Sequence, residues 1–132
     1  ALYINNSEPS IRKLRFVNNY STSGGGAMVL DNSSPTISNV LMIKNETNGL
    51  GGAVKLINGA APKFVNVTVA DNVAGTGGAF YTTESSNMNV INSILYGDTK
   101  PEIYAGGSAN VEVTYTLVEE GSNEDLDRKS VV

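Results

Sequence analysis

Apolar and polar residues alternate with a period of two over short stretches of this chain. Val54–Leu56 and Val67–Val69 each place one polar residue between two apolar residues. Because successive side chains of a strand point to opposite faces of a sheet, this alternation predicts short β-strands with one buried face. Segments rich in glycine, asparagine and serine separate the stretches and predict sharp corners between the strands.

The alternating stretches recur at a constant interval. A Gly-Gly-Ala sequence begins at Gly25, Gly51 and Gly77, so that equivalent residues are 26 positions apart. A proline recurs in the second half of each unit, at Pro9, Pro35 and Pro62. The step from Pro35 to Pro62 is one position longer than the others, and one inserted residue near 59–61 accounts for the difference. Such a sustained register indicates a repeat protein.

Apolar positions after each proline align between the units and predict the ladders of one core. The aligned sets are Ile11, Leu14 and Phe16; Ile37, Val40 and Met42; Phe64, Val67 and Val69; and Val90, Ser93 and Leu95. Each set closes on an amide or an acid, at Asn19, Asn45, Asn72 and Asp98. In stacked coils these residues form a column, in which asparagine side chains can hydrogen-bond to one another and the backbone can adopt left-handed angles. We therefore expect an asparagine ladder that ends at Asp98.

The length of the unit and its several short strands predict an all-β fold, a right-handed parallel β-helix. This single-chain β-solenoid should have four to five coils. Helical repeats of the ankyrin, tetratricopeptide and HEAT types are longer, and the Leu-x-x-Leu-x-Leu frame of leucine-rich repeats is absent from the chain. We expect coils over residues 1–118, as part of a longer solenoid, and an acidic tail over 119–132. The glycine pairs should mark corners where φ is positive or where backbones crowd.

The repeat resembles those of two groups of surface proteins. Phe16-Val17-Asn18-Asn19, followed by Gly24-Gly25-Gly26-Ala27, is similar to the repeat of chlamydial polymorphic outer-membrane proteins, although the later units replace the phenylalanine. Segments 92–98, 102–104 and 115–119 resemble the last coils of secreted, pectin-lyase-like β-helix proteins of Bacteroidetes. These resemblances imply a β-helix of the adhesin or autotransporter-passenger type. They also imply a superfamily that includes polysaccharide lyases and glycosidases.

Composition limits the classes of partner. The chain has 13 acidic residues against 9 Lys and Arg, with a net charge of −4, so it lacks the basic surface that binds nucleic acid. Cysteine is absent, which excludes disulfides and thiolate metal sites. No stretch is apolar enough to predict a transmembrane segment. We expect an extracellular protein, or one on a bacterial cell surface in association with the outer membrane.

Five residues are candidates for binding. Tyr3, Lys55 and Tyr81 follow equivalent corners and should project from one solvent-exposed face, with Val29 in the same column. Tyrosine rings on such a face can contact sugars or anchor proteins. Asp71 and Asp98 lie near corners of consecutive coils and form the best candidate acidic pair, although a substitution within the ladder explains Asp98 without any functional role.

No catalytic, cofactor-binding or metal-binding residue is assigned from the sequence. The chain has no histidine for general-base catalysis at neutral pH. Its C-terminal acidic residues lack the Asp-x-Asp-x-Gly spacing of a calcium loop, so no motif supports a Ca²⁺ cofactor.

Two functions remain open. Regular coils without a polar cluster favour a non-catalytic, adhesin-like module that displays a rigid face for a polysaccharide or a host surface protein. The alternative is a segment of a carbohydrate-active β-helix enzyme, a polysaccharide lyase or glycoside hydrolase, with its active site on other coils. Terminal coils expose strand edges. We therefore also expect edge-to-edge self-association through uncapped coils, or an edge at which more chain continues.

Overall fold

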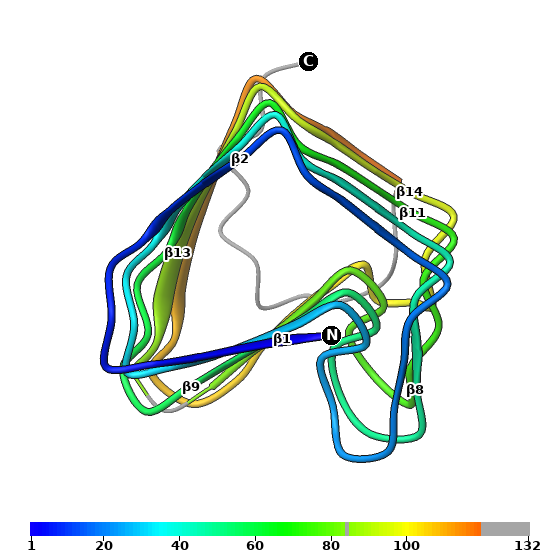
Figure 1. The fold of residues 1–132 in the computed structure, drawn as a ribbon, viewed down its shortest axis with the longest axis horizontal. Helices are drawn as coiled ribbons and strands as arrows, with labels where there is room; N and C mark the ends of the chain where they lie inside the picture. Colours follow the sequence, from blue (N-terminus) through cyan, green and yellow to red (C-terminus); the bar gives the residue numbers. More distant parts are fainter. Residues whose placement is uncertain (84, 120–132) are drawn as a thin grey trace.

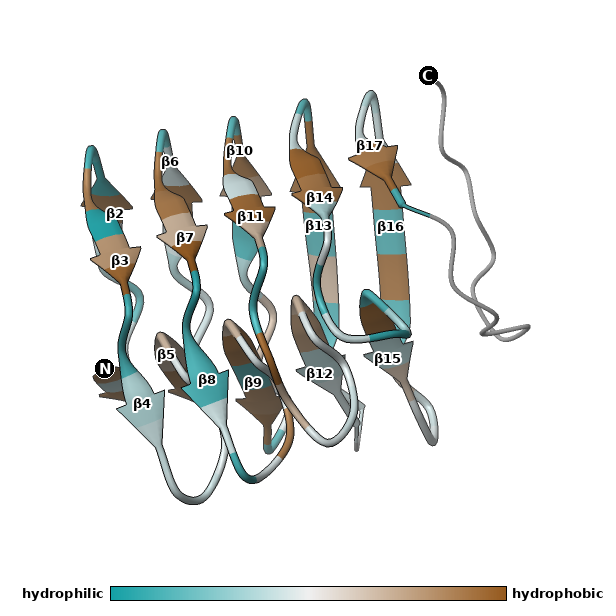
Figure 2. Ribbon diagram, turned by 90° about the vertical axis from the view of Figure 1, so that its right-hand side faces the viewer, coloured by the Kyte–Doolittle hydropathy of each residue, from teal (hydrophilic) through white to brown (hydrophobic). Residues whose placement is uncertain are grey.

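The computed structural model describes residues 1–83 and 85–119, which wind into a parallel β-solenoid. Three five-stranded parallel sheets form its walls. Figure 1 looks along the solenoid and shows a roughly triangular cross-section, and Figure 2 shows the coils side by side. The predicted all-β solenoid is therefore confirmed.

Each of the three sheets takes one strand from every coil. Sheet A contains β1 (Leu2–Asn5), β5 (Met28–Asp31), β9 (Val54–Ile57), β12 (Phe80–Thr82) and β15 (Ile103–Ala105). Sheet B contains β2 (Ser10–Arg12), β6 (Thr36–Ser38), β10 (Lys63–Val65), β13 (Asn87–Ile91) and β16 (Asn110–Thr114). Sheet C contains β3 (Arg15–Val17), β7 (Leu41–Ile43), β11 (Thr68–Ala70), β14 (Ile94–Tyr96) and β17 (Leu117–Val118). Between sheets C and A, β4 (Tyr20–Ser21) pairs with β8 (Glu46–Thr47).

The register of the strands reproduces the sequence repeat. Along sheet A, β1, β5, β9 and β12 pair residues that are 26 apart. Phe64 pairs with Ile37, a step one position longer, so the inserted residue lies between β9 and β10, as predicted. Tyr104 pairs with Tyr81 across a shorter step, because the connection between β14 and β15 is shorter than its equivalents.

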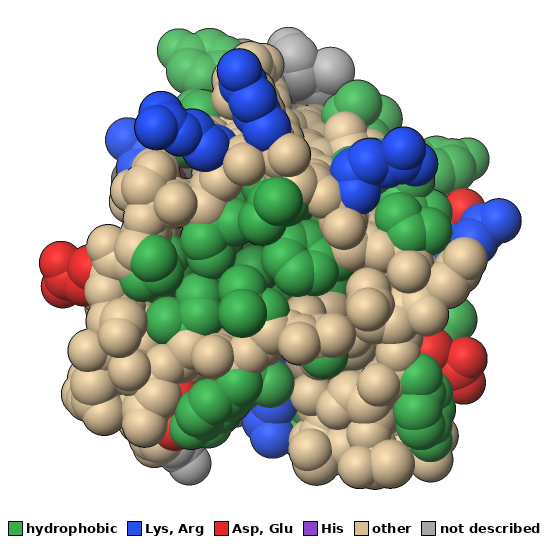
Figure 3. Space-filling model, in the orientation of Figure 1, with side chains coloured by type: hydrophobic (Ala, Val, Ile, Leu, Met, Phe, Trp, Pro, Cys, Tyr) green, Lys and Arg blue, Asp and Glu red, His purple; other side chains and the backbone are tan. Residues whose placement is uncertain are grey.

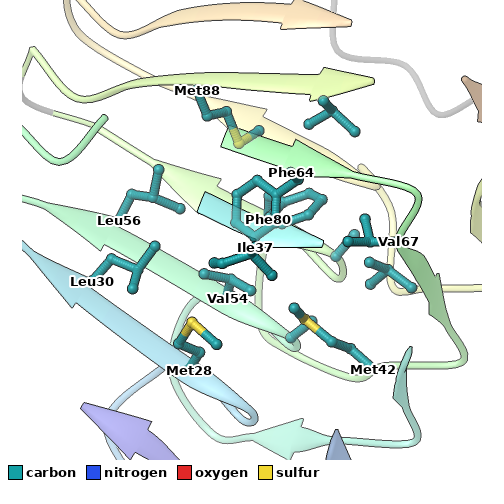
Figure 4. Close-up of a cluster of buried hydrophobic side chains, with 14 of the residues drawn as sticks. Met28, Leu30, Ile37, Met42, Val54, Leu56, Phe64, Val67, Phe80 and Met88 are labelled. Carbon is teal, nitrogen blue, oxygen red and sulfur yellow. The ribbon is translucent and has the colours of Figure 1, made fainter. Parts of the chain in front are cut away.

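The predicted inward-facing positions form one continuous core. All of them are buried except in the first coil, where Leu14 is 46% exposed and Phe16 is half-buried. In the middle coils, Phe64 of sheet B meets Phe80 of sheet A with ring centroids 4.7 Å apart (Figure 4). Burial of these aliphatic and aromatic side chains is the main force that holds the three sheets together.

The corners depend on left-handed backbone residues, but not on the ladder residues themselves. Positive φ occurs at Asn18 (55°), Lys44 (54°), Asp71 (55°) and Gly97 (74°), each directly before a member of the Asn19–Asp98 column. The prediction that the column residues adopt left-handed angles is therefore wrong by one position. The short polar side chain turns inward because the residue before it makes the corner.

The two glycines of each pair serve different purposes. Gly51 has a φ of +76°, a conformation that strains residues with a side chain. A Cβ on Gly52 would come within 2.3 Å of the carbonyl oxygen of Gly78 in the next coil. Positive φ, predicted as one reason for the pair, thus applies to its first member, whereas crowding against the next coil applies to the second.

The first coil leaves one side of its strands unpaired, since β1, β2 and β3 each lie at the edge of a sheet. Figure 3 shows hydrophobic side chains at the centre of this end of the solenoid and Lys and Arg side chains at its margin. Self-association through this end stays a prediction. The predicted acidic tail, 119–132, lies outside the described residues apart from Glu119.

Candidate functional site

The outer face of sheet A carries a column of five side chains on consecutive strands. These are Tyr3, Val29, Lys55, Tyr81 and Tyr104, which pair in register from β1 to β15. We call this set the tyrosine column. The structure therefore places three of the predicted binding residues on one face, with Val29 between them as expected. Tyr104 was missed, because the shortened fourth coil takes it out of the period of the repeat.

Two tyrosines at one end of the column stack on each other. The rings of Tyr81 and Tyr104 are nearly parallel, with 4° between their planes and 5.0 Å between their centroids. Tyr104 also lies over Gly106, where a Cβ would come within 2.9 Å of the ring atom Cε1. Each tyrosine thus covers one face of the other ring, and the packing holds both rings in place.

A hydrogen-bonded group holds the other end of the column. The hydroxyl of Tyr3 donates to Asp31 Oδ2 over 2.5 Å, and Asn58 Nδ2 donates to Asp31 Oδ1 over 2.7 Å. The hydrogen bonds from Tyr3 and Asn58 lower the pKa of Asp31, and the same contact with Asp31 raises the pKa of Tyr3. Tyr3 remains 59% exposed, so its ring is fixed in orientation yet open to solvent.

Lys55 lies at the middle of the column, against the loop of an adjacent coil. A Cβ on Gly24 would meet Lys55 Cδ at 2.7 Å, so the lysine stem packs over this glycine. Lys55 Nζ lies 3.5 Å from the carbonyl oxygen of Ser23. The loop between β4 and β5 therefore borders the tyrosine column and orients its one cationic side chain.

The predicted asparagine ladder is present in the wall between sheets C and A. Asn45 donates from Nδ2 to Asn72 Oδ1 in the next coil over 2.9 Å and to the carbonyl of Phe16 over 3.0 Å. Its own Oδ1 accepts from the backbone N–H and the Nδ2 of Asn19 over 3.1 and 2.8 Å. Every bond between rungs runs in the same direction, so the ladder is polar along the solenoid.

The ladder ends on an acid that lacks the amide donor of the earlier rungs. Asp98 Oδ1 accepts from the backbone N–H and from Nδ2 of Asn72, both over 2.6 Å. A carboxyl group has no donor when ionised and only one when protonated, whereas an amide has two. The alanine that precedes the sheet A strand in earlier coils is also replaced here, by Glu102. It directly precedes Ile103, as Ala79 precedes Phe80, and Ala79 N–H donates to the Glu102 carbonyl.

Four charged residues gather at this end of the ladder, and we call them the carboxyl cluster: Asp98, Lys100, Glu102 and Glu119. Glu102 Oε1 accepts from Asp98 N–H over 3.3 Å and from Lys100 Nζ over 3.0 Å. Lys100 Nζ also reaches Glu119 Oε2 over 2.7 Å. Among the described residues, the second oxygens of the two buried acids, Asp98 Oδ2 and Glu102 Oε2, have no hydrogen-bond partner.

The electrostatics of the cluster favour a proton on Asp98 at neutral pH. Burial raises the pKa of Asp98 to about 8, with a further contribution from Glu102, against the opposing hydrogen bonds from Asn72. Desolvation lowers the pKa of Lys100, but its hydrogen bonds to Glu119 and Glu102 outweigh this effect and raise it. The hydrogen bond from Lys100, and a second from Gly97 N–H, lower the pKa of Glu119.

Asp71 and Asp98, the candidate acidic pair, lie on adjacent coils but in different environments. Asp71 is exposed, and its Oδ1 lies over Gly97, where a Cβ would come within 2.7 Å. Asp98 is only 4% exposed and points into the wall. The geometry of Asp98 therefore matches the alternative given above, a substitution within the ladder, and the two carboxyl groups do not face a common solvent-exposed space.

The charged neighbours of Asp98 were not identified from the sequence, although the column had predicted Asn72 as its neighbour in the ladder. Glu102 and Lys100 belong to a connection that is shorter than its equivalents, so no repeat position could be assigned to them. Within residues 1–83 and 85–119, no group of three or more His, Cys, Asp or Glu side chains is arranged to hold a metal ion. No helix in this part of the chain is long and apolar enough to cross a membrane.

Comparison with protein families agrees with the architecture. A family model described as a right-handed β-helix region matches residues 1–124. This match confirms the predicted handedness of the solenoid. The specific resemblances to chlamydial and Bacteroidetes repeats are not confirmed, since no curated protein and no solved structure shows significant similarity to the chain.

Proposed function

Because this chain belongs to the right-handed β-helix family, we propose that it is a non-catalytic, adhesin-like binding module that presents a rigid face to a polysaccharide at a cell surface. The observation that supports the proposal is the tyrosine column. It aligns three tyrosines and a lysine along the outer face of sheet A at the spacing of successive strands, about 4.8 Å.

The chemistry of the column suits sugars. Tyrosine rings offer apolar surface together with a hydroxyl group that can donate or accept a hydrogen bond. Asp31 and Asn58 add a carboxylate and an amide beside Tyr3, and such polar groups can bind sugar hydroxyls. Lys55 supplies one positive charge at the centre, which favours a chain that carries acidic sugars or other anionic substituents.

The column is also fixed before any ligand arrives. Stacking restricts Tyr81 and Tyr104, the hydrogen bond to Asp31 restricts Tyr3, and packing over Gly24 restricts the stem of Lys55. Ordering a free side chain at an interface costs about 0.5–1.5 kcal/mol. Side chains held by the solenoid avoid much of this cost, so a modest number of contacts can give useful affinity.

We expect Tyr3→Ala and Lys55→Ala each to weaken binding of the best glycan by about 5- to 30-fold, the effect of removing one contact worth about 1–2 kcal/mol. The ligand is first identified with the labelled protein on a glycan array that includes neutral and acidic polysaccharides. Dissociation constants are then measured by isothermal titration calorimetry.

The chain offers a matched control for each variant. Tyr20 is 54% exposed on β4, which belongs to a sheet other than sheet A, and Lys63 is exposed on the outer face of sheet B. Tyr20→Ala and Lys63→Ala should bind like the parent protein. Equal losses of affinity in the variants and their controls would show that the binding site does not lie on sheet A. Depolymerisation of the bound polysaccharide would overturn the non-catalytic part, and binding to a protein alone would overturn the choice of ligand.

A further inference from the structure

The outer face of sheet C is apolar along most of its length. Side chains that point outward from its strands include Leu41, Ile43, Ala70, Ile94, Tyr96 and Leu117, and we call these six the apolar face. Ile94 is 45% exposed, Tyr96 54% and Leu117 48%. In Figure 2, which looks onto this side, brown bands recur on β3, β7, β14 and β17.

The apolar face differs in composition from one outward column of sheet B. The equivalent outward column of sheet B contains Ser10, Thr36, Lys63, Asn89 and Glu112 in register. In sheets B and C the strands pair through backbone hydrogen bonds, so the pairing does not require apolar side chains on the outer face. Contiguous exposed apolar patches of this kind mark interaction sites.

The apolar face is flanked by opposite charges at its two ends. One outward column runs Arg15, Leu41, Thr68, Ile94, Leu117, and the other runs Val17, Ile43, Ala70, Tyr96. Glu119 follows β17 and continues the second column beyond Tyr96. Arg15 is exposed at one end of the face, and Glu119 lies at the other. The smallest outward side chains, Thr68 and Ala70, lie on the middle strand, β11.

We propose that this face joins two copies of the chain in an antiparallel dimer, with a twofold axis that runs parallel to the strands at β11. The axis places β7 of one copy opposite β14 of the other, so that Leu41 faces Ile94 and Ile43 faces Tyr96. It also brings Arg15 diagonally opposite Glu119, so that the charges at the ends complement each other. The small residues of β11 face their own copies on the axis and allow the two sheets to approach closely.

The charges at the two ends of the apolar face favour an antiparallel dimer over a parallel one. In a parallel dimer Arg15 would lie diagonally opposite Arg15, and Glu119 diagonally opposite Glu119, and like charges brought close together oppose association. Glu119 already accepts from Lys100 and Gly97 N–H. A carboxylate has about four acceptor sites, so an arginine from the partner can be added.

The size of the face limits the strength of the dimer. Five strands at a spacing of about 4.8 Å span roughly 19 Å, and three residues of strand span about 10 Å. The flat area enclosed by these two lengths is well below the roughly 800 Å² per partner of a standard stable interface. The proposal is therefore a weak, reversible dimer rather than an obligate one.

The first test is sedimentation equilibrium from about 10 µM to 1 mM. The parent chain should approach the dimer mass at the upper end, and Ile94→Lys should weaken association at least tenfold. Ile91→Lys is the matched control, because Ile91 lies on neighbouring β13 and its side chain faces outward from sheet B. A strict monomer over the whole range, or equal effects of the two variants, would overturn the proposal.

The second test uses the absence of cysteine from the chain. Single cysteines are introduced and treated with a bismaleimide of about 10 Å span, the usual distance between packed sheets. Ala70→Cys should cross-link to itself, whereas Leu41→Cys and Ile94→Cys should cross-link efficiently only when mixed. Cross-linking between Ser10→Cys and Glu112→Cys instead would show end-to-end stacking and overturn the face-to-face dimer. Dimerisation only after removal of residues 120–132 would make that segment the occupant and would also overturn it.

Discussion

Asn72→Ala is expected to lower the free energy of unfolding by about 3–5 kcal/mol, since each buried polar group left without a partner costs about 1–3 kcal/mol. The side chain of Asn72 accepts from Asn45 and donates to Asp98 Oδ1 and to the carbonyls of Met42 and Ala70. All of these contacts lie in the buried wall between sheets C and A. Alanine removes them without offering replacements, and no space for bulk water adjoins a residue that is 0% exposed.

The measurement is urea unfolding followed by circular dichroism, with the parent chain and Asn48→Ala in parallel. Asn48 is exposed in the loop after β8, and its backbone N–H donates to the carbonyl of Ser21. Its replacement should change stability by no more than about 0.5 kcal/mol. A loss below about 1 kcal/mol for Asn72→Ala would mean that the ladder is not a significant source of stability.

Asp98→Asn is expected to stabilise the protein at mildly alkaline pH and to flatten its pH dependence. The pKa of Asp98 is raised from 3.8 to about 8 in the folded chain. Between these values the folded state binds more protons than the unfolded state, so the parent chain loses stability as the pH rises from about 4 to about 8. Each unit of pKa difference corresponds to about 1.4 kcal/mol, so we expect a difference of about 2–5 kcal/mol by pH 8.

An asparagine at position 98 avoids this loss in two ways. It cannot ionise, and its Nδ2 can donate to the side chain of Glu102, of which one buried oxygen has no partner among the described residues. Asp71→Asn is the matched control, because it removes the same charge at an exposed position on the preceding coil. Thermal melts at pH 4, 6 and 8 should separate parent from Asp98→Asn increasingly with pH. Parallel curves for the two proteins would contradict a raised pKa at Asp98.

The parts of the fold predicted from the sequence are those that the repeat period determines. The constant spacing of the repeat assigns each residue to a column, and alternation within a strand assigns it to the inner or outer face. These two rules were enough to place Tyr3, Lys55 and Tyr81 on one face. The register of hydrogen bonds in the asparagine ladder followed from the same columns.

The parts that were missed lie where the period fails or where alternation carries no information. The shortened connection between β14 and β15 removes the Gly-Gly-Ala marker, so Glu102 and Tyr104 could not be aligned with earlier coils. In β7, Leu41–Ile43 is apolar on both faces, so alternation alone does not separate its outward residues from the core residue, which only alignment with the other coils identified. At the corners, Asn18 and Asn19 are identical in type, and the sequence alone did not distinguish the left-handed residue from the rung that follows it.

The one-way hydrogen bonding of the ladder has a consequence for how the length of such a rod can change. Each asparagine rung presents an acceptor to the coil before it and a donor to the coil after it. A duplicated or deleted segment therefore preserves the hydrogen bonds of the ladder only when it comprises whole units. Both breakpoints must then lie at equivalent positions of the repeat. Asp98 accepts like any rung but lacks the amide donor, so it cannot replace an asparagine rung without loss of the bond to the next rung. Gene rearrangement within this chain is expected to vary the number of units that precede Asp98.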